Sequence, residues 1–128
     1  MRRFAENAYF VLIVVFIAEV LAQFVTAGLG VFGAESFDLH KDLGGLTHLV
    51  SFVILLLAIG VRRNRIDLGL AITLFVLVTI QLILPDTRDD ARGLAGMHVL
   101  NALFVFIVAE HLLRREITTR RAARPPAV

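Results

Sequence analysis

Four residues of types that are costly in hydrocarbon interrupt the long apolar runs of this chain: Glu19, His48, Gln81 and His98. An ionisable group at membrane depth usually faces the interior of a helix bundle and marks a site. Two imidazoles on facing helices at one depth are the ligands that a haem with two axial histidines requires. Two histidines and a carboxylate are also a common ligand set for zinc or non-haem iron. These residue types therefore predict a haem or metal site inside a membrane.

The four residues lie at matched distances from arginines at the ends of the apolar runs. Sixteen residues separate Glu19 from its reference arginine, and the separations are 14 for His48, 16 for Gln81 and 16 for His98. The reference residues are Arg3, Arg62, Arg65 and Arg114. At 1.5 Å per residue, all four polar residues sit roughly 21–24 Å from one boundary of a hydrocarbon core about 30 Å thick. We expect each helix to contribute one polar residue to a single layer.

Helical periodicity assigns the neighbouring polar residues to the same faces, because residues three, four and seven apart share one side of a helix. The aligned sets are Glu19, Gln23 and Thr26; His40, Gly44, Thr47, His48 and Ser51; and His98, Asn101 and Val105. We expect His48 and His98 to face each other as axial ligands, with His40 as the alternate ligand. Gly44, one turn from His48, would leave room for a flat macrocycle.

The other polar residues receive supporting roles in this interpretation. Glu19 and Gln81 would hold the imidazole tautomers and tune the potential, as outer partners of metal-bound histidines do. Gln23 and Asn101 would hydrogen-bond to a propionate, to a quinone oxygen or to water. An alternative is that the histidines only hydrogen-bond to neighbouring helices and hold them together.

Composition indicates the elements that must position these residues. The chain has 128 residues, of which 58% are hydrophobic and 19% charged, with a mean hydropathy of +0.81. Soluble domains are about 45–50% apolar and about 25% charged. There is no cysteine, which excludes disulfide frameworks, thiolate metal sites and thiol catalysis. Four apolar runs, each near the roughly 20 residues that span a bilayer, predict an all-α membrane protein.

We expect one four-helix bundle over residues 1–113, with an up-down-up-down topology and helices at about 8–30, 40–61, 66–84 and 94–113. Short connections favour this arrangement, in which the second and fourth helices are diagonal partners. The second helix must begin near His40, because its continuous apolar stretch from Leu49 to Val61 is too short to span alone. Residues 114–128 are interpreted as a basic tail, solvated or lying against anionic headgroups.

The arginines predict the orientation. Ten of the 13 basic residues fall before the first helix, between the second and third helices, or after the fourth helix. By the positive-inside rule, both termini are then cytoplasmic, and the chain is a multi-pass protein of the cytoplasmic (inner) membrane. Nothing aromatic or groove-reading accompanies the arginines of the tail, so no nucleic acid is expected as a partner.

Two resemblances involve the same residues. The stretches Gly28–Phe32 and Phe37–Gly44, followed by His48 and by His98–Ala102, resemble a prokaryotic family of short four-helix membrane proteins of unknown function. The segment His40-Lys41-Asp42-Leu43-Gly44 is similar to the His-Lys-x-x-Gly element of bacterial b561-type membrane cytochromes. That likeness implies b haem and electron transfer with quinone or superoxide, and it makes His40 the ligand-like position, in conflict with the depth count that favours His48. The b561-type proteins usually carry histidines for two haems, whereas this chain has residues for one.

The sequence therefore predicts a membrane protein with one b-type haem per chain near the outer face, used for electron transfer. A quinone, a redox partner or a second copy of the chain are the partners considered. One alternative is a non-haem metal or proton-relay site built from Glu19, His48 and His98. Another is a non-catalytic scaffold or accessory subunit, in which the polar layer only sets the register of the helices. Whether the protein is an enzyme stays open, and no catalytic residue is assigned.

Overall fold

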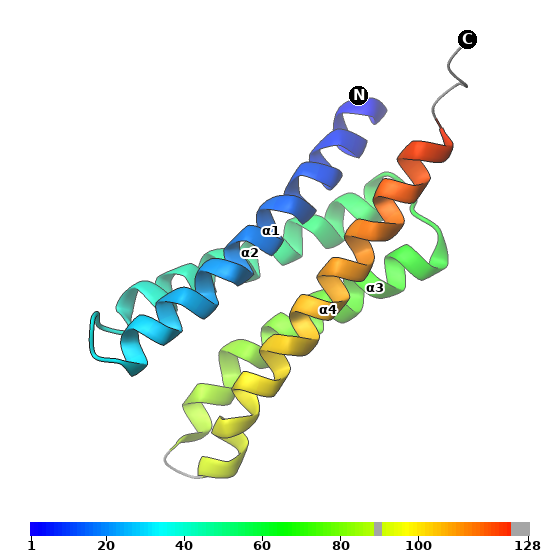
Figure 1. Cartoon of the computed structure of the whole chain (residues 1–128). Helices are drawn as coiled ribbons and strands as arrows, with labels where there is room; N and C mark the ends of the chain where they lie inside the picture. Colours follow the sequence, from blue (N-terminus) through cyan, green and yellow to red (C-terminus); the bar gives the residue numbers. More distant parts are fainter. Residues whose placement is uncertain (89–90, 124–128) are drawn as a thin grey trace.

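The computed structural model of the chain describes residues 1–88 and 91–123, and this part is all-helical (Figure 1). The elements are α1 (Arg2–Val31), α2 (Asp38–Gly60), α3 (Arg65–Ile83), the short 3₁₀ helix η1 (Leu84–Arg88) and α4 (Arg92–Ala122). Within the described residues, four helical segments are long and apolar enough to cross a membrane. The protein is therefore a multi-pass membrane protein that contacts the lipid bilayer.

Consecutive helices run in opposite directions and pack side by side (Figure 1). Helix α1 also packs against α4, which closes the bundle, so α2 and α4 lie on one diagonal and α1 and α3 on the other. The start of α1 and the end of α4 meet at one end of the bundle. We call this the basic end, and the opposite end, with the α1–α2 and α3–α4 connections, the pocket end.

Local chemistry sets where the helices begin and end. The Asn64 side chain accepts hydrogen bonds from the backbone N–H groups of Ile66 and Asp67, which caps the start of α3. Pro85 follows the last α-helical turn of α3, where the chain tightens into η1. Gly33 has a φ of +70°, a left-handed conformation that glycine adopts at low cost, and it turns the chain from α1 toward α2.

The apolar core fills the middle of the bundle and extends toward the basic end. Its buried members come from all four helices: Tyr9, Ile13, Phe16, Val20, Val50, Ile54, Ala58, Ala71, Leu74, Val78, Val105, Ala109 and Leu112. Val20, Val78 and Val105 are the core residues that also line a cavity at the pocket end. The packed core therefore ends where the polar residues of interest begin.

Two helix boundaries differ from those predicted from hydropathy. Helix α1 begins at Arg2 rather than near residue 8, and α4 continues to Ala122 rather than ending near residue 113. Residues 114–122 of the expected basic tail are therefore helical, and residues 124–128 lie outside the described part. Hydropathy marks only the apolar stretch, whereas ion pairs one turn apart stabilise the charged turns beyond it. Arg2–Glu6 and Arg120–Glu116 are such pairs.

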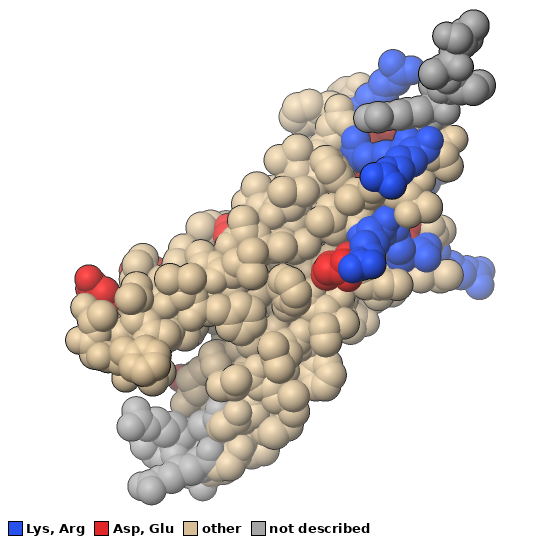
Figure 2. Space-filling model, viewed as in Figure 1, with Lys and Arg blue, Asp and Glu red and all other residues tan. Residues whose placement is uncertain are grey.

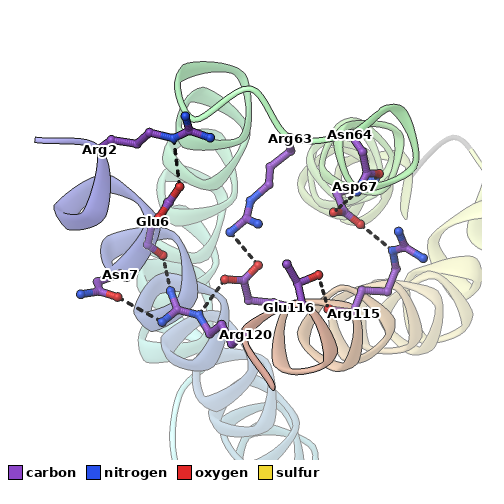
Figure 3. A network of polar contacts seen from close by, with 10 residues as sticks. Arg2, Glu6, Asn7, Arg63, Asn64, Asp67, Arg115, Glu116 and Arg120 are labelled. Carbon is purple, nitrogen blue, oxygen red and sulfur yellow. Dashed lines mark hydrogen bonds and ion pairs between the residues drawn. The ribbon is translucent and has the colours of Figure 1, made fainter. Parts of the chain in front are cut away.

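The charged side chains at the basic end form a network that joins α1, the α2–α3 connection, α3 and α4 (Figures 2 and 3). The Glu116 carboxylate, 3% exposed, accepts from Arg63 at 2.6 Å and from Arg120 at 2.7 Å. Arg120 also donates to Asn7 and to the backbone carbonyl of Glu6 in α1. Beside it, Arg115 pairs with Asp67, which also accepts from Asn64. Buried charges are costly unless paired, and here each buried carboxylate has a guanidinium partner.

Candidate functional site

Several polar side chains inside the bundle line a cavity of about 330 Å³ at the pocket end. All four helices contribute to its wall, which is mostly apolar. Its polar side chains are Gln23, His40, Lys41, Thr47, Gln81, Asp86 and His98. Figure 2 shows the molecule hollowed at this end, between the tip of the α1–α2 pair and that of the α3–α4 pair. An apolar cavity with a few convergent polar groups is the usual form of a ligand site.

His40 and His98 come together in this cavity from the diagonal helices α2 and α4. Their ring centres are 6.0 Å apart and their planes are inclined at 71°. The ring of Phe37 packs edge-on against His40, with ring centres 6.3 Å apart. Phe37 can take this place because residue 30 is glycine: a Cβ at Gly30 would lie only 2.7 Å from the Phe37 ring. The two histidines are therefore positioned by the packing of the helix ends.

Hydrogen bonds determine which ring nitrogen of His98 carries the proton. Its Nδ1 lies 3.1 Å from the backbone carbonyl of Gln81, and a carbonyl can only accept, so Nδ1 is the protonated nitrogen. The Gln81 side chain in turn donates to the backbone carbonyl of His98 and accepts from Asn101 at 2.6 Å. These hydrogen bonds hold His98 in the tautomer whose lone pair is on Nε2. Hydrogen-bond partners of metal-bound histidines fix the tautomer in the same way.

The same reasoning applies to His40. Its Nδ1 lies 3.3 Å from the Thr26 hydroxyl, which donates its single proton to the backbone carbonyl of Gln23. The hydroxyl oxygen is then the acceptor and His40 Nδ1 the donor. His40 therefore also has its lone pair on Nε2. Two imidazoles with unprotonated Nε2 atoms meet in one cavity.

The structure does not bring His48 and His98 together, so the expected facing pair is wrong. The His48 ring stacks on Phe75 of α3, with ring centres 5.2 Å apart and planes at 20°. Its Nε2 lies 3.1 Å from the Thr79 hydroxyl, which donates to the backbone carbonyl of Phe75, so His48 Nε2 carries the proton. His48 is not among the residues that line the cavity. It acts as a hydrogen-bonding link between α2 and α3.

Helix length and helix rotation explain this correction. Because α4 continues past Arg114, that arginine does not mark the end of the helix. Counted from Arg120 in the terminal network, His98 is 22 residues away, close to the 23 residues between His40 and Arg63. His40 and His48 are eight residues apart, which is about 80° of rotation at 100° per residue. His48 therefore turns toward α3, while His40 reaches α4.

The remaining predicted site residues separate into two groups. Gly44 and Gln23 line the cavity, and a Cβ at Gly44 would lie 3.4 Å from Gln23 Nε2, so this glycine makes room for the amide. Gln23 Oε1 is buried without a hydrogen-bond partner and can accept from a ligand. Asn101 lies outside the cavity wall and uses its Nδ2 on Leu77 and Gln81, so its expected contact with a ligand is wrong.

Glu19 touches neither histidine of the cavity. Its carboxyl lies beside the Thr47 hydroxyl of α2, and its Oε2 is buried without a partner. Among residues 1–88 and 91–123, no group of three or more His, Asp or Glu side chains is arranged to hold a metal ion. A centre built from Glu19, His48 and His98 therefore lacks the geometry it requires.

Sequence reasoning missed two kinds of residue. Thr26 was expected on the same helix face as Glu19 and Gln23 but received no role. Its position seven residues after Glu19 was the signal that could have suggested one. Asp67 received no role, and Glu116 fell within the residues interpreted as a basic tail, although both lie close to arginines in the sequence. Their burial at 4% exposure depends on helices that meet only in the folded chain.

One comparison with known proteins gives a match. Residues 23–88, which are 66 of the 128 residues, match the model of a family of unknown function, DUF6220. The chain belongs to this family. The DUF6220 match runs from Gln23 through α2 and α3 into η1, so it includes His40, Gly44 and Gln81 and ends before His98. No curated protein and no solved structure matches the chain.

Proposed function

We propose that this DUF6220 protein binds one b-type haem per chain between His40 and His98 and transfers electrons in the cytoplasmic membrane. The observation that carries the proposal is the meeting of two imidazoles whose Nδ1 atoms are both occupied as donors. Two imidazoles on opposite sides of one metal have ring centres about 6 Å apart, since a metal–nitrogen bond is about 2 Å and each nitrogen is about 1 Å from its ring centre. The observed separation of 6.0 Å fits that arrangement.

The cavity supplies other groups suited to haem. Its wall is mostly apolar, and Lys41 offers a cation for a propionate. A bound haem would supply one-electron chemistry, and the protein would tune it through the Nδ1 hydrogen bonds to Thr26 and Gln81. Electrons would be exchanged with a membrane-soluble quinone, with superoxide or with a redox partner, including another copy of the chain.

The positive-inside rule gives the orientation of this proposal. The basic end would face the cytoplasm with both termini, and the cavity would lie toward the outer face of the inner membrane. A quinone or an external partner would therefore approach the histidine pair from that side.

A structural scaffold is the second candidate, favoured by the His48–Thr79 and Gln81–Asn101 hydrogen bonds between helices. An absorption spectrum of the detergent-purified protein, expressed with added haem and measured air-oxidised and then reduced, separates the two functions. A Soret band and a reduced alpha band at about one haem per chain are expected for a cytochrome with two histidine ligands. A protein that stays colourless would exclude haem binding.

Alanine variants of the histidines then test the ligands. We expect His40→Ala and His98→Ala each to lose the bands of the six-coordinate haem while the helical circular dichroism is retained. His48→Ala is the matched control, because the same substitution removes a histidine outside the cavity, and it should keep one haem per chain. Loss of haem in His48→Ala, with full haem in His40→Ala, would reverse the assignment.

A further inference from the structure

The polar contacts at the pocket end divide the bundle into two helical hairpins. In the α1–α2 hairpin, the Thr26 hydroxyl accepts from His40, and the Phe37 ring lies against Gly30. In the α3–α4 hairpin, Gln81 bonds to both His98 and Asn101. These hydrogen bonds join helices within one hairpin. Each hairpin is therefore fastened internally at this end.

The hydrogen bonds and ion pairs between the two hairpins, within the part of the chain that the structure describes, lie elsewhere. Among the described residues, three sets of hydrogen bonds and ion pairs link the hairpins. The His48–Thr79 hydrogen bond lies near the middle. The Arg63–Glu116 ion pair and the hydrogen bonds from Arg120 to Glu6 and Asn7 lie at the basic end. Toward the pocket end the two hairpins diverge (Figure 1), and the surface is hollowed between them (Figure 2). Among the described residues, the polar links between the hairpins are thus concentrated at the basic end.

The cavity histidines belong to different hairpins, His40 to the first and His98 to the second. Their rings approach to 6.0 Å between centres, and the hydrogen bonds of both rings go to partners within their own hairpins. A metal centre bound by both imidazoles would join the hairpins where they diverge. In lipid, association of helices gains little from the hydrophobic effect, because lipid tails are as apolar as leucine side chains. Among the side chains that the structure describes, no ion pair comparable to those of the basic end links the hairpins at the pocket end.

We propose that ligation by His40 and His98 works as a clasp: a bound ligand holds the two hairpins at the pocket end in the arrangement described, and without it the hairpins separate there while the basic end stays fixed. This inference rests on the proposed haem site. It goes further by making occupancy of the site control the shape of the membrane-embedded protein.

Distances between spin labels test the clasp directly, because the chain has no native cysteine. Labels on Glu35→Cys and Leu94→Cys, both at exposed positions, report the separation of the hairpins at the pocket end. The matched control pair, Arg3→Cys with Arg121→Cys, reports the separation at the basic end. Pulsed electron double resonance is recorded in lipid nanodiscs on haem-free and haem-loaded protein, with loading checked by absorption.

We expect the Glu35–Leu94 distribution to be long and broad without haem and to become shorter and narrower with haem, while the control pair does not change. Adding His98→Ala to the labelled chain should keep the distribution broad in the presence of haem. A haem-loaded protein whose pocket-end distribution equals that of the haem-free protein would overturn the clasp and leave the haem site standing. A chain that takes up no haem would overturn the proposed function and the clasp together.

Discussion

Removing the charge of Glu116 tests the network that holds the basic end. Each carboxylate oxygen accepts from a different guanidinium, Arg63 at 2.6 Å and Arg120 at 2.7 Å, and the carboxylate is 3% exposed. In Glu116→Gln one oxygen remains an acceptor, and the other becomes an amide that points its hydrogens at an arginine. Breaking a buried ion pair on one side costs about 3–5 kcal/mol. Because one hydrogen bond survives, we expect the lower part of that range, about 3 kcal/mol.

Glu110→Gln is the matched control for this prediction. Glu110 pairs with Arg114 in the same helix, but its side chain is 35% exposed and that of Arg114 is 76% exposed. Exposed pairs four residues apart in a helix contribute about 0.3–0.5 kcal/mol. Thermal unfolding in one detergent, followed by helical circular dichroism, compares the two variants with the unmodified chain. If the free energies of unfolding of Glu116→Gln and Glu110→Gln differed by less than about 1 kcal/mol, the Glu116 ion pairs would not stabilise the basic end as described.

Two further predictions concern the groups that position His40. Thr26→Val removes the acceptor of the His40 Nδ1 proton, so we expect haem affinity in a titration to fall about 10–100-fold, with Thr26→Ser close to the unmodified chain. An unchanged affinity in Thr26→Val would show that the hydroxyl does not orient the ring. Gly30→Ala places a Cβ 2.7 Å from the Phe37 ring and should lower both haem content and melting temperature. Gly28→Ala, with no atom within 4 Å of the added Cβ, should change neither, and equal effects of the two variants would contradict the packing argument.

Hydropathy and residue types predicted several features of the structure. Four apolar runs predicted four helices, and four helical segments able to span a membrane are present. Polar residues at membrane depth pointed to the interior, and His40, His98, Gln81, Gln23 and Gly44 do line one cavity. The ring of His98 meets that of His40, whereas the depth count had paired His98 with His48.

The depth count failed because it took every arginine for a boundary. Arg114 lies inside a helix that continues to Ala122, stabilised by contacts with residues of α1 and of the α2–α3 connection. Those partners are more than 50 residues away in the chain, so no local sequence pattern predicts these contacts. The position at which α4 ends therefore cannot be predicted from the sequence of that helix alone.

The sequence by itself determined the class of this protein, because the length of an apolar helix and the cost of a polar group in lipid depend only on residue types. It also indicated that histidines lie within or beside the apolar segments. Only the tertiary structure decided which histidines meet. That depends on the rotation of each helix and on the positions along α2 and α4 at which the two helices face each other. The tertiary structure likewise decided the tautomers: Thr26, Thr79 and the Gln81 carbonyl reach the imidazoles only after the helices have packed.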